Sequence, residues 1–367
     1  MNTTLSFMLD SANKNNMVNK IILEPNFMLA IKIITIIMTS ILNGFLIVVF
    51  TFLTKRKQFS DLIFISIALS DFLNGVLTMT SQTVLDMNEN KWPFSRQSCL
   101  FFVFVQYAMP DTTLLSVVVL SINRYLQMKN LKLNSKYEKI NFFNLTKLIG
   151  VWVFASIFWI NTIICMIYLN QFSFDRCDIE PSFIYKISKV LIFGLIPLVL
   201  IIYLNVLSMN ILNQNSKKFL VSSATIKRDE SFANLLPSTN IENKNIMNEN
   251  KTALITSTNS NKKQLSKYNK MSMKNTHLKT KYKKAIVCIL AVTLSIFLTQ
   301  IVYLISWPIY LLHCVEANQL IELAYRCGVW LTYLNSLTNP IIVIIFHQKV
   351  RKILFGLICT NKKIDSS

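Results

Sequence analysis

Long apolar stretches of this chain contain ionisable side chains, among them Asp71, Asp111, Arg124 and Lys189. A charge is costly in a hydrocarbon layer, so it is retained where it pairs, binds a ligand or ion, or meets a partner at the membrane surface. Asp111 and Lys189 have opposite charges and are expected to face each other. Arg124 ends its stretch, in Ser-Ile-Asn-Arg-Tyr, where it indicates signalling rather than transport or catalysis.

The sequence offers no arrangement of residues suited to catalysis. The histidines, His277, His313 and His347, are far apart along the chain, and there is no nucleophile motif or phosphate-binding loop. The seven cysteines are too scattered for a zinc site or a disulfide scaffold. We therefore expect no enzyme activity and no organic cofactor.

The composition is typical of a membrane protein. Of the 367 residues, 52% are hydrophobic and only 15% are charged, whereas about a quarter are charged in soluble domains. A helix of about 20 apolar residues spans a bilayer and satisfies its own backbone there. The sequence therefore predicts an all-α bundle of seven spanning helices, near residues 28–54, 60–84, 98–125, 146–169, 183–212, 284–312 and 319–346.

The distribution of charge predicts the orientation. The net charge is +20, but the bases gather in alternate connections and leave the others nearly neutral, so a lipid surface explains them better than nucleic acid. This pattern places the N-terminus outside the plasma membrane and the C-terminus in the cytoplasm. The basic segments are 55–57, 129–147, 217–284 and 349–363; the neutral or mildly acidic ones are 1–27, 85–97 and 170–182.

The segments outside the spans divide into three parts. Residues 1–27 are expected to be an extracellular segment without a cleaved signal peptide, and Asn2 begins a glycosylation sequon. Residues 213–283, between the first five spans (28–212) and the last two (284–346), are expected to be a disordered basic loop whose ends extend the flanking helices to about 220 and from about 276. Residues 347–367 predict a short amphipathic helix and tail, in which Cys359 is either palmitoylated or a free thiol.

Two cysteines are predicted to lie outside the membrane. Cys99 begins the third span and Cys177 lies in the next outer loop. That compartment permits oxidation, so the two are candidates for a disulfide that holds the loop over the bundle.

Several motifs, in order and spacing, resemble those of rhodopsin-like G-protein-coupled receptors. Among these the chain is most similar to amine receptors of the histamine group, to which the run from Tyr325 to Ser336 looks closest. The motifs are Asn43-Gly44, Leu69-Ser70-Asp71, Trp92-Pro93-Phe94, Cys99, Asn123-Arg124-Tyr125, Trp152, Cys177, Pro197 and Asn339-Pro340.

The resemblance implies a sodium site and a coupling site. The intramembrane carboxylate of Asp71 would hold the ion together with oxygens of Asn43, Thr113, Asn335, Ser336 and Asn339; a hydrogen-bond network without an ion remains the alternative. Arg124, with Asn123 and Tyr125, would engage a heterotrimeric G protein, the alternative being an arginine that only anchors its helix at the interface. Pro197 and Pro340 would bend their helices.

The ligand pocket departs from the family pattern. Gln106 occupies the position of the amine-binding aspartate, and a neutral amide cannot neutralise a buried ammonium. We therefore expect no ordinary amine ligand. Asp111 and Lys189 either line a pocket for a polar, perhaps zwitterionic, small molecule or form a structural ion pair. The remaining pocket wall is expected from Tyr107, Phe193, Gln300, Tyr303, Trp330 and Tyr333.

Activation elements also differ. Phe297 stands where the family carries a tryptophan switch, and no proline follows it. The tyrosine expected after Asn339-Pro340 is replaced by Val343. Asn123 replaces an acid beside Arg124, and Lys279 stands where a second restraining acid is expected, so basal activity should be raised if coupling is retained.

The favoured interpretation is a receptor that transmits an extracellular signal to heterotrimeric G proteins. A signalling-silent ligand-binding receptor is an alternative, because activation motifs are missing. A channel or transporter is less favoured, since neither repeated halves nor a recurring polar pathway is present.

Overall fold

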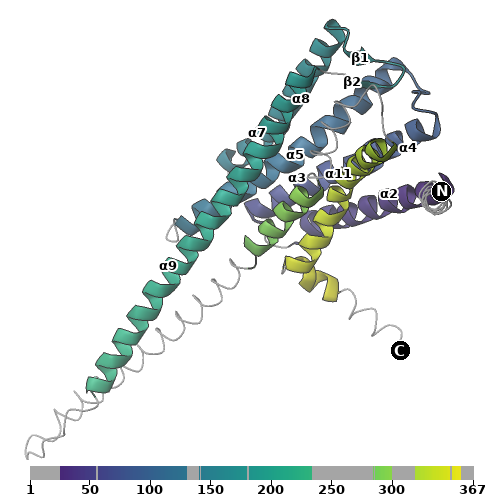
Figure 1. The fold of residues 1–367 in the computed structure, drawn as a ribbon. Coiled ribbons are helices and arrows are strands. Elements are labelled where there is room, and N and C mark those ends of the chain that lie inside the picture. Colours follow the sequence, from purple (N-terminus) through teal and green to yellow (C-terminus); the bar gives the residue numbers. More distant parts are fainter. Residues whose placement is uncertain are drawn as a thin grey trace, which may run out of the picture.

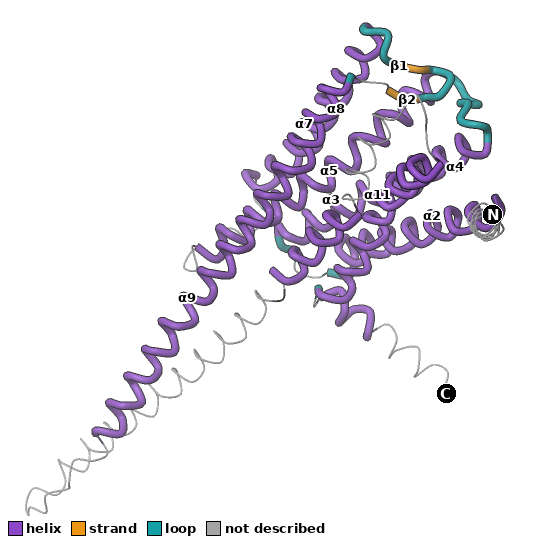
Figure 2. Tube along the Cα trace, in the orientation of Figure 1, coloured by secondary structure: helices purple, strands orange, loops and turns teal. Residues whose placement is uncertain are grey.

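The computed structural model describes residues 25–54, 57–129, 140, 142–179, 182–233, 284, 286–299, 319–347 and 349–356. This part of the chain is helical apart from short connections and one hairpin (Figures 1 and 2). The helices are α2 (Pro25–Val48), α3 (Phe59–Leu73), α4 (Thr80–Met87), α5 (Arg96–Lys129), α7 (Phe142–Tyr168), α8 (Phe183–Lys189), α9 (Ile196–Ala233) and α11 (Gln319–Phe346). Residues 286–299 and 349–356 are also helical.

Six helical stretches in the described residues are long and apolar enough to cross a membrane. They confirm the predicted helical membrane fold and correspond to spans one to five and seven. The sixth predicted span is described only from residue 284 to 299, where Ile286–Thr299 forms a shorter apolar helix.

In the described residues, three wide π-helical turns interrupt the spans: η1 (Val49–Leu53), η2 (Asn74–Met79) and η4 (Val190–Leu195). The third has a local cause. Pro197 has no backbone N–H, so the carbonyl of Phe193 cannot receive the regular bond from four residues later. The helix widens just before this proline, between Lys189 and the start of α9.

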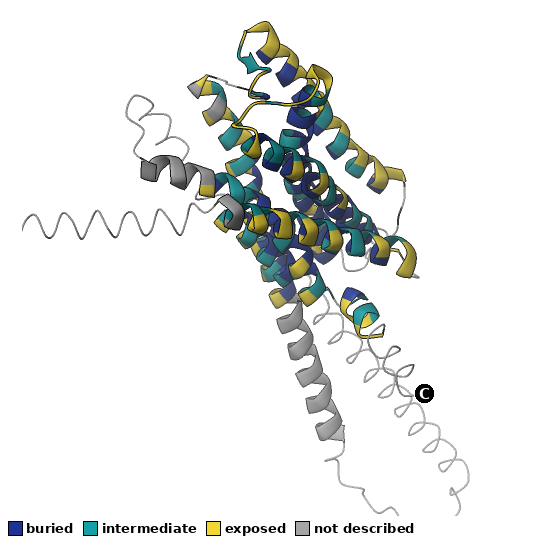
Figure 3. Cartoon of the chain, turned by 90° about the vertical axis from the view of Figure 1, so that its right-hand side faces the viewer, coloured by how far each residue is buried: buried dark blue, intermediate teal, exposed yellow. Residues whose placement is uncertain are grey.

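The central helix of the bundle is α5, which packs against α3, α7 and α9. Its buried face is apolar from Cys99 to Met109 and mixes polar with apolar residues from Asp111 to Met128. Outward-facing positions of the bundle are instead large and apolar, as at Ile34, Ile41, Ile157 and Ile164. Figure 3 shows exposed positions on the outside of the helices around a buried interior. A surface of this kind is suited to lipid.

The hairpin closes one end of the bundle, named here the hairpin end. Strand β1 (Phe172–Ser173) pairs antiparallel with β2 (Asp178–Ile179), with Phe172 opposite Ile179. A disulfide joins Cys99 at the start of α5 to Cys177, which confirms the predicted pairing. The loop is also held by a 2.7 Å hydrogen bond from the backbone N–H of Trp92 to the backbone carbonyl of Asp175.

At the opposite end, the helix over residues 349–356 docks against the foot of α3. Lys349 forms a 2.6 Å ion pair with Asp61, and Val350 is fully buried. The His347 ring packs edge-on against Phe50 and Phe64. The predicted helix after the seventh span is therefore present, attached to the bundle by charge and aromatic contacts.

The helix that contains the fifth span is longer than expected, whereas the span itself, Ile187–Gln214, agrees with the prediction. Helix α9 continues to Ala233, well past the predicted extension to about residue 220, and extends away from the bundle in Figure 1. Residues 234–283, the rest of the predicted basic loop, lie outside the described residues.

Candidate functional site

A buried carboxylate and an indole form the centre of the hairpin-end site. The Nε1–H of Trp159 on α7 donates a 2.8 Å hydrogen bond to Oδ2 of Asp111 on α5. Asp111 is 8% exposed and Trp159 is fully buried. Because this donor partly satisfies the carboxylate, Asp111 can remain charged between two helices.

Lys189 lies over the neighbouring aromatic pair. Its ammonium nitrogen is 4.3 Å from the ring centroid of Tyr107 and 4.7 Å from that of Trp159, two rings that stack 4.7 Å apart. Such contacts are cation–π interactions. Lys189 and Asp111 do not come within salt-bridge distance of each other, so the ion pair considered in the sequence analysis is not formed directly between these two described residues. Trp159 joins them instead, its edge to Asp111 and its face to Lys189.

The hairpin contributes a second carboxylate to this group. Tyr107 donates its hydroxyl to Oδ1 of Asp178 at 2.8 Å, and the backbone N–H of Ile179 donates to the same oxygen. Both Asp178 and Asp111 act electrostatically on Lys189. Among the described residues, the site thus brings the ammonium of Lys189 and the carboxylates of Asp111 and Asp178 around the rings of Tyr107 and Trp159.

Other predicted pocket residues flank this group. Phe193 is buried against Phe158, with ring centroids 4.5 Å apart. The Oε1 atom of Gln106 is buried and has no hydrogen-bond partner among the described residues. Gln300 and Tyr303 lie outside the described residues, as do Asn2 and Cys359.

Two predicted wall residues belong to a second polar group, at the start of α2. Trp330 packs edge-on against Tyr333 and lies under Lys32, whose Nζ is 4.7 Å from the indole centroid. Lys32 forms a 2.7 Å ion pair with Asp86, which also accepts from Gln82. This group connects α2, α4 and α11.

The carboxylate of Asp71 lies in the middle of the bundle and is almost completely buried. Its Oδ1 accepts from Ser336 at 2.9 Å and Thr113 at 3.2 Å, and its Oδ2 accepts from Asn339 at 2.9 Å. Asn43 joins indirectly, by donating to the backbone oxygen of Ser336. The predicted residues of this group therefore converge from four helices.

Several amide oxygens close to this carboxylate lack donors. Oδ1 atoms of Asn43, Asn74, Asn335 and Asn339 are buried without a hydrogen-bond partner among the described residues. Asn74 was not predicted from the sequence; its Nδ2 donates to Ser336 at 3.0 Å. Carboxylate and amide oxygens are the ligands of hard cations, so this donor set fits a sodium ion.

A tight apolar layer separates the Asp71 group from Arg124. It contains Ile67, Val117, Leu120, Ile289 and Val343. The void inside this layer is only about 10 Å³, at most the space of one water molecule. The two polar groups are therefore isolated from each other in this conformation.

Arg124 is 6% exposed at the far end of α5. Its Nη1 donates to Oε1 of Gln127 at 3.0 Å, one turn later in the same helix. The Nδ2 atom of Asn123 is buried without a hydrogen-bond partner among the described residues. Tyr125 lies beside Lys129, whose ammonium is 6.0 Å from its ring centroid.

The expected switch residue does not point into the bundle. Phe297 is 38% exposed, whereas Ile296 beside it is buried. The helix over residues 286–299 contains no proline, so its regular period places Ile286, Ile289 and Ile296 inward and Phe297 outward. Helix α11 does contain a proline, Pro340, and continues through it to Phe346.

Trp159 was missed by sequence reasoning, although a signal was present. It follows Trp152 by seven residues, two helical turns, so both face the same side of α7. Trp152 donates to Ser66 at 2.8 Å on α3, as Trp159 donates to Asp111 on α5. Asp178 was missed because the partners of a loop carboxylate depend on how the loop folds.

A bundle of apolar spans with an intramembrane carboxylate and an arginine at one end defines a multi-pass membrane receptor. A family model of 7 transmembrane receptors (rhodopsin family) matches residues 42–342. The chain belongs to this family, whose members are not enzymes.

Individual relatives are amine receptors. The human histamine H4 receptor is 21% identical over 357 residues, which covers 88% of this chain and 89% of that receptor. The human histamine H1 receptor is 24% identical over 37% of this chain and 28% of its own length. The 5-hydroxytryptamine receptor 2B of Dichotomyctere fluviatilis is 24% identical over 30% of this chain and 23% of its own.

Proposed function

We propose that this rhodopsin-family receptor lies in the plasma membrane with its hairpin end outside, binds a small polar ligand there, and activates a heterotrimeric G protein at the Arg124 end. The observation that carries the proposal is the layered interior. The hairpin-end site around Asp111 and Lys189, called the mixed-charge site from here on, is followed along α5 by the Asp71 group, the closed apolar layer and Arg124. A ligand that binds one arrangement of these layers more tightly shifts the bundle toward it.

The mixed-charge site supports a zwitterionic ligand rather than a simple amine. An ammonium already occupies the aromatic pair of Tyr107 and Trp159, and it comes from Lys189 of the chain itself. Gln106 adds a buried amide oxygen without a donor. A ligand with both a cationic and an anionic group could satisfy Asp111, Gln106 and Lys189 together.

A sodium ion is proposed at Asp71. Thr113, Ser336 and Asn339 hold the carboxylate, and the amide oxygens without donors complete an oxygen set for the ion. The charge of the ion would stabilise the arrangement in which these helices stay close. Opening of the apolar layer toward Arg124 would then weaken the ion's site, coupling the two groups.

Arg124 is proposed to meet the G protein when the helix over residues 286–299 moves away from α5. Cys288 of that helix lies near enough to Arg124 for the charge of the guanidinium to act on its thiol. The partner of Arg124 in its own helix is the neutral Gln127, and Asn123 adds no negative charge. The lack of an acid at position 123, beside Arg124, supports raised basal activity.

The test is nucleotide exchange on purified heterotrimeric G proteins by the full-length chain in phospholipid vesicles. We expect exchange above that of empty vesicles without ligand, and its loss in Arg124→Leu at equal receptor density. If no G-protein class responds while a zwitterionic ligand still binds, the chain is a signalling-silent receptor. Solute uptake into the same vesicles would instead indicate a transporter.

The ligand site has a separate test. Exchanging the charges, in Asp111→Lys with Lys189→Asp, should restore surface expression or response relative to either single change. Because Trp159 stands between the two groups, recovery is expected to be partial. A double variant no better than the singles counts against a shared role for the two residues.

A further inference from the structure

Two rows of polar side chains face each other between α2 and the helical stretch formed by α3, η2 and α4. Within each row the residues are three or four positions apart, so each row follows one side of its helix. The first row is Lys32, Thr35, Thr39 and Asn43, and the second is Asp71, Asn74, Thr78, Gln82 and Asp86. Because α2 packs against α3, η2 and α4, the two rows meet in one interface, called the α2–η2 seam from here on.

The outer end of the seam lies at the hairpin end of the bundle. There Lys32 and Asp86 form their 2.7 Å ion pair, with 16% and 25% of the two side chains accessible. Gln82 donates to the other carboxylate oxygen of Asp86 at 3.0 Å. Charge and solvent access therefore meet at this end of the seam.

The inner end of the seam lies at the Asp71 group. Asn43 donates to the backbone oxygen of Ser336 at 2.9 Å, and Asn74 donates to the hydroxyl of Ser336 at 3.0 Å. Ser336 in turn donates to Asp71 at 2.9 Å. Both asparagines are therefore joined to the buried carboxylate through one residue.

Between these ends, the seam contains buried oxygen atoms that have no hydrogen-bond partner among the described residues. They are Oγ1 of Thr39, Oγ1 of Thr78, Oδ1 of Asn43 and Oδ1 of Asn74, and each of these residues is at most 2% exposed. A buried polar atom without a hydrogen bond is costly and rare. Water satisfies such atoms in polar interior sites, since it both donates and accepts. A row of water molecules along the seam satisfies all four.

The seam is narrow at its middle. The second row passes there through the wide turn η2, and π-helical turns are frequent at functional sites. Thr39 lies so close to Gly75 that a Cβ atom on the glycine would be 3.0 Å from Cγ2 of the threonine. The seam therefore admits water and small ions and excludes larger solutes.

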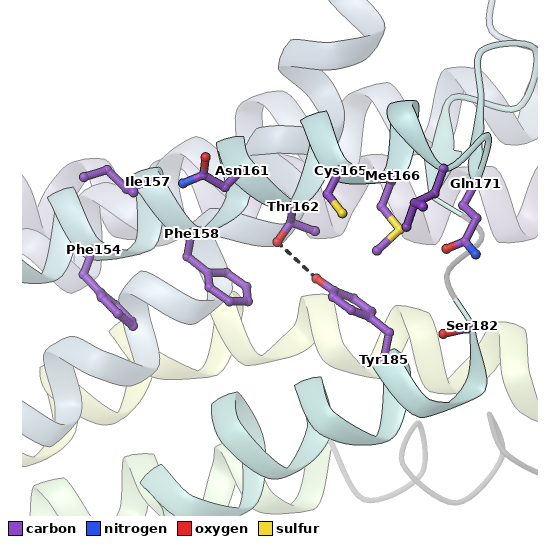
Figure 4. Close-up of a pocket in the computed structure, with 11 residues that line it drawn as sticks. Phe154, Ile157, Phe158, Asn161, Thr162, Cys165, Met166, Gln171, Ser182 and Tyr185 are labelled. Carbon is purple, nitrogen blue, oxygen red and sulfur yellow. Dashed lines mark hydrogen bonds between the residues drawn. The ribbon is translucent and has the colours of Figure 1, made fainter.

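The groove between α7 and α8, shown in Figure 4, is a different kind of hollow. Phe154, Ile157 and Phe158 line part of it, none of its described lining residues is charged, and it shares no lining residue with the seam. A cation is attracted to carboxylates, and the seam has one at each end, Asp86 and Asp71. The seam is therefore the better route for a cation.

We propose that the α2–η2 seam is a hydrated path by which small monovalent cations pass between the outside and Asp71, and that the Lys32–Asp86 ion pair is its outer gate. A cation that enters must share Asp86 with Lys32, whose ammonium repels it. Removal of that ammonium therefore speeds entry. Exchange of the sodium ion along this path rests on the proposed function, whereas hydration of the seam does not.

Silver ions test the path, because they are small monovalent cations that bind thiols. The full-length chain with Thr78→Cys is placed in phospholipid nanodiscs and exposed to silver nitrate without chloride. Thiols that remain free are then alkylated and located by mass spectrometry, so the native cysteines are distinguished. The control is Val76→Cys on the same turn, since Val76 is 38% exposed on the outside of the bundle whereas Thr78 is fully buried. We expect the thiol of Thr78→Cys to react about ten times faster, because position 76 faces hydrocarbon and not a hydrated path with carboxylates at its ends.

The gate has its own variants, each combined with Thr78→Cys. Lys32→Met keeps the length of the side chain and removes its charge, so silver should react about three times faster. Asp86→Asn removes the attraction and should slow the reaction. Lys91→Met is the matched control, because Lys91 is exposed at the same end and lies outside the seam; it should leave the rate unchanged.

Thermal unfolding measures hydration separately. Thr39→Val and Thr78→Val keep the shape of the side chain and remove the hydroxyl. If water bonds these hydroxyls, both variants should unfold at a lower temperature; in a dry seam, loss of an unpaired polar group should raise it. Thr35→Val shows the effect of the exchange where no water is needed, since Thr35 donates to the backbone oxygen of Ile31 in its own helix at 2.8 Å. The loss in Thr39→Val should be at least as large as in Thr35→Val.

The outcomes separate the possibilities. Equal reaction of Thr78→Cys and Val76→Cys overturns the path, as does a higher unfolding temperature in both Thr39→Val and Thr78→Val. An unchanged rate in Lys32→Met overturns the gate, and slowing by Gln106→Trp instead would place the entry at the mixed-charge site. If Thr78→Cys does not fold, Thr39→Cys reports from the facing row. If sodium fails to stabilise the receptor while silver still reaches the seam, the proposed ion at Asp71 is wrong and the hydrated path stands.

Discussion

The indole N–H of Trp159 donates a 2.8 Å hydrogen bond to the carboxylate of Asp111, which joins α7 to α5 across 48 residues. Trp159→Phe keeps an aromatic ring and removes the donor. Since Asp111 is buried, the variant should lose about 1–3 kcal/mol of stability. Thermal unfolding of the purified receptor in detergent measures this loss.

Trp152→Phe is the matched control for that experiment. It removes an indole bond of the same length on the same helix, but one made to the neutral hydroxyl of Ser66. Losing a bond to a neutral partner costs less, about 1 kcal/mol. An equal fall in the two variants would show that the charge on Asp111 contributes nothing to the bond.

The ammonium of Lys189 is expected to be replaceable by a free amine. Lys189→Ala leaves the rings of Tyr107 and Trp159 without their cation, which should lower thermal stability. Added n-butylamine, protonated at neutral pH, should restore part of that stability. The cation–π contact contributes about 0.5–2 kcal/mol. A free amine that makes the same contact therefore binds weakly, and rescue should need n-butylamine at concentrations on the order of 10 mM or more.

The control for this rescue is n-butanol, which has similar size and no charge. It should not stabilise Lys189→Ala at the same concentration. If the alcohol works as well as the amine, the effect is simple filling of a cavity. If neither works, the cation over these rings is not a separable part of the site.

The limits of the sequence prediction follow from what each signal encodes. Asp71 and its partners were predictable, because a carboxylate in an apolar span must find polar groups and few are available there. The disulfide followed from topology, since both cysteines lie at the same end. A direct pairing of Asp111 and Lys189 was predicted but is not observed, because Trp159 lies between them. Trp159 comes from a third helix, whose rotation the spacing of charges does not determine.

Phe297 shows a different limit. Its inward direction was assumed from a family position, whereas the helix over residues 286–299 has no proline to change its path and follows its own apolar period. That period was already visible at Ile286, Ile289 and Ile296. The length of α9 beyond residue 220 was also missed, because polar composition argues against a packed core and says less about a single helix.

Sodium should stabilise this receptor through Asp71. The expected gain is about 1.4 kcal/mol when the ion is at ten times its dissociation constant, seen as a rise in unfolding temperature in NaCl relative to equal N-methylglucamine chloride. Asp71→Asn should remove the dependence, and Asp111→Asn should retain it. A sodium effect that persists in Asp71→Asn would assign the ion elsewhere.

Asn123→Asp should lower basal signalling. The new carboxylate stands beside Arg124, which donates to the neutral Gln127, and it adds an opposite charge within a buried region. A coupling of about 1 kcal/mol reduces basal nucleotide exchange about five-fold. Asn123→Ala removes the amide without adding charge and should leave exchange near the wild-type level. A similar fall in both variants would indicate loss of packing instead.

Gly75 permits a close approach of two helices beside the Asp71 group. A Cβ atom at this position would lie 3.0 Å from Cγ2 and 3.3 Å from Cβ of Thr39 on α2, and Thr39 is fully buried. Gly75→Ala should therefore force α2 away from η2 and cost about 1–3 kcal/mol of stability, measured by thermal unfolding.

Gly150→Ala, with no atom within 4 Å of its added Cβ, should be neutral or stabilising by up to about 1 kcal/mol, because alanine favours helix. Thr39→Ser removes the obstructing methyl group, so the double variant with Gly75→Ala should recover most of the loss; a double variant as unstable as Gly75→Ala alone would place the strain elsewhere.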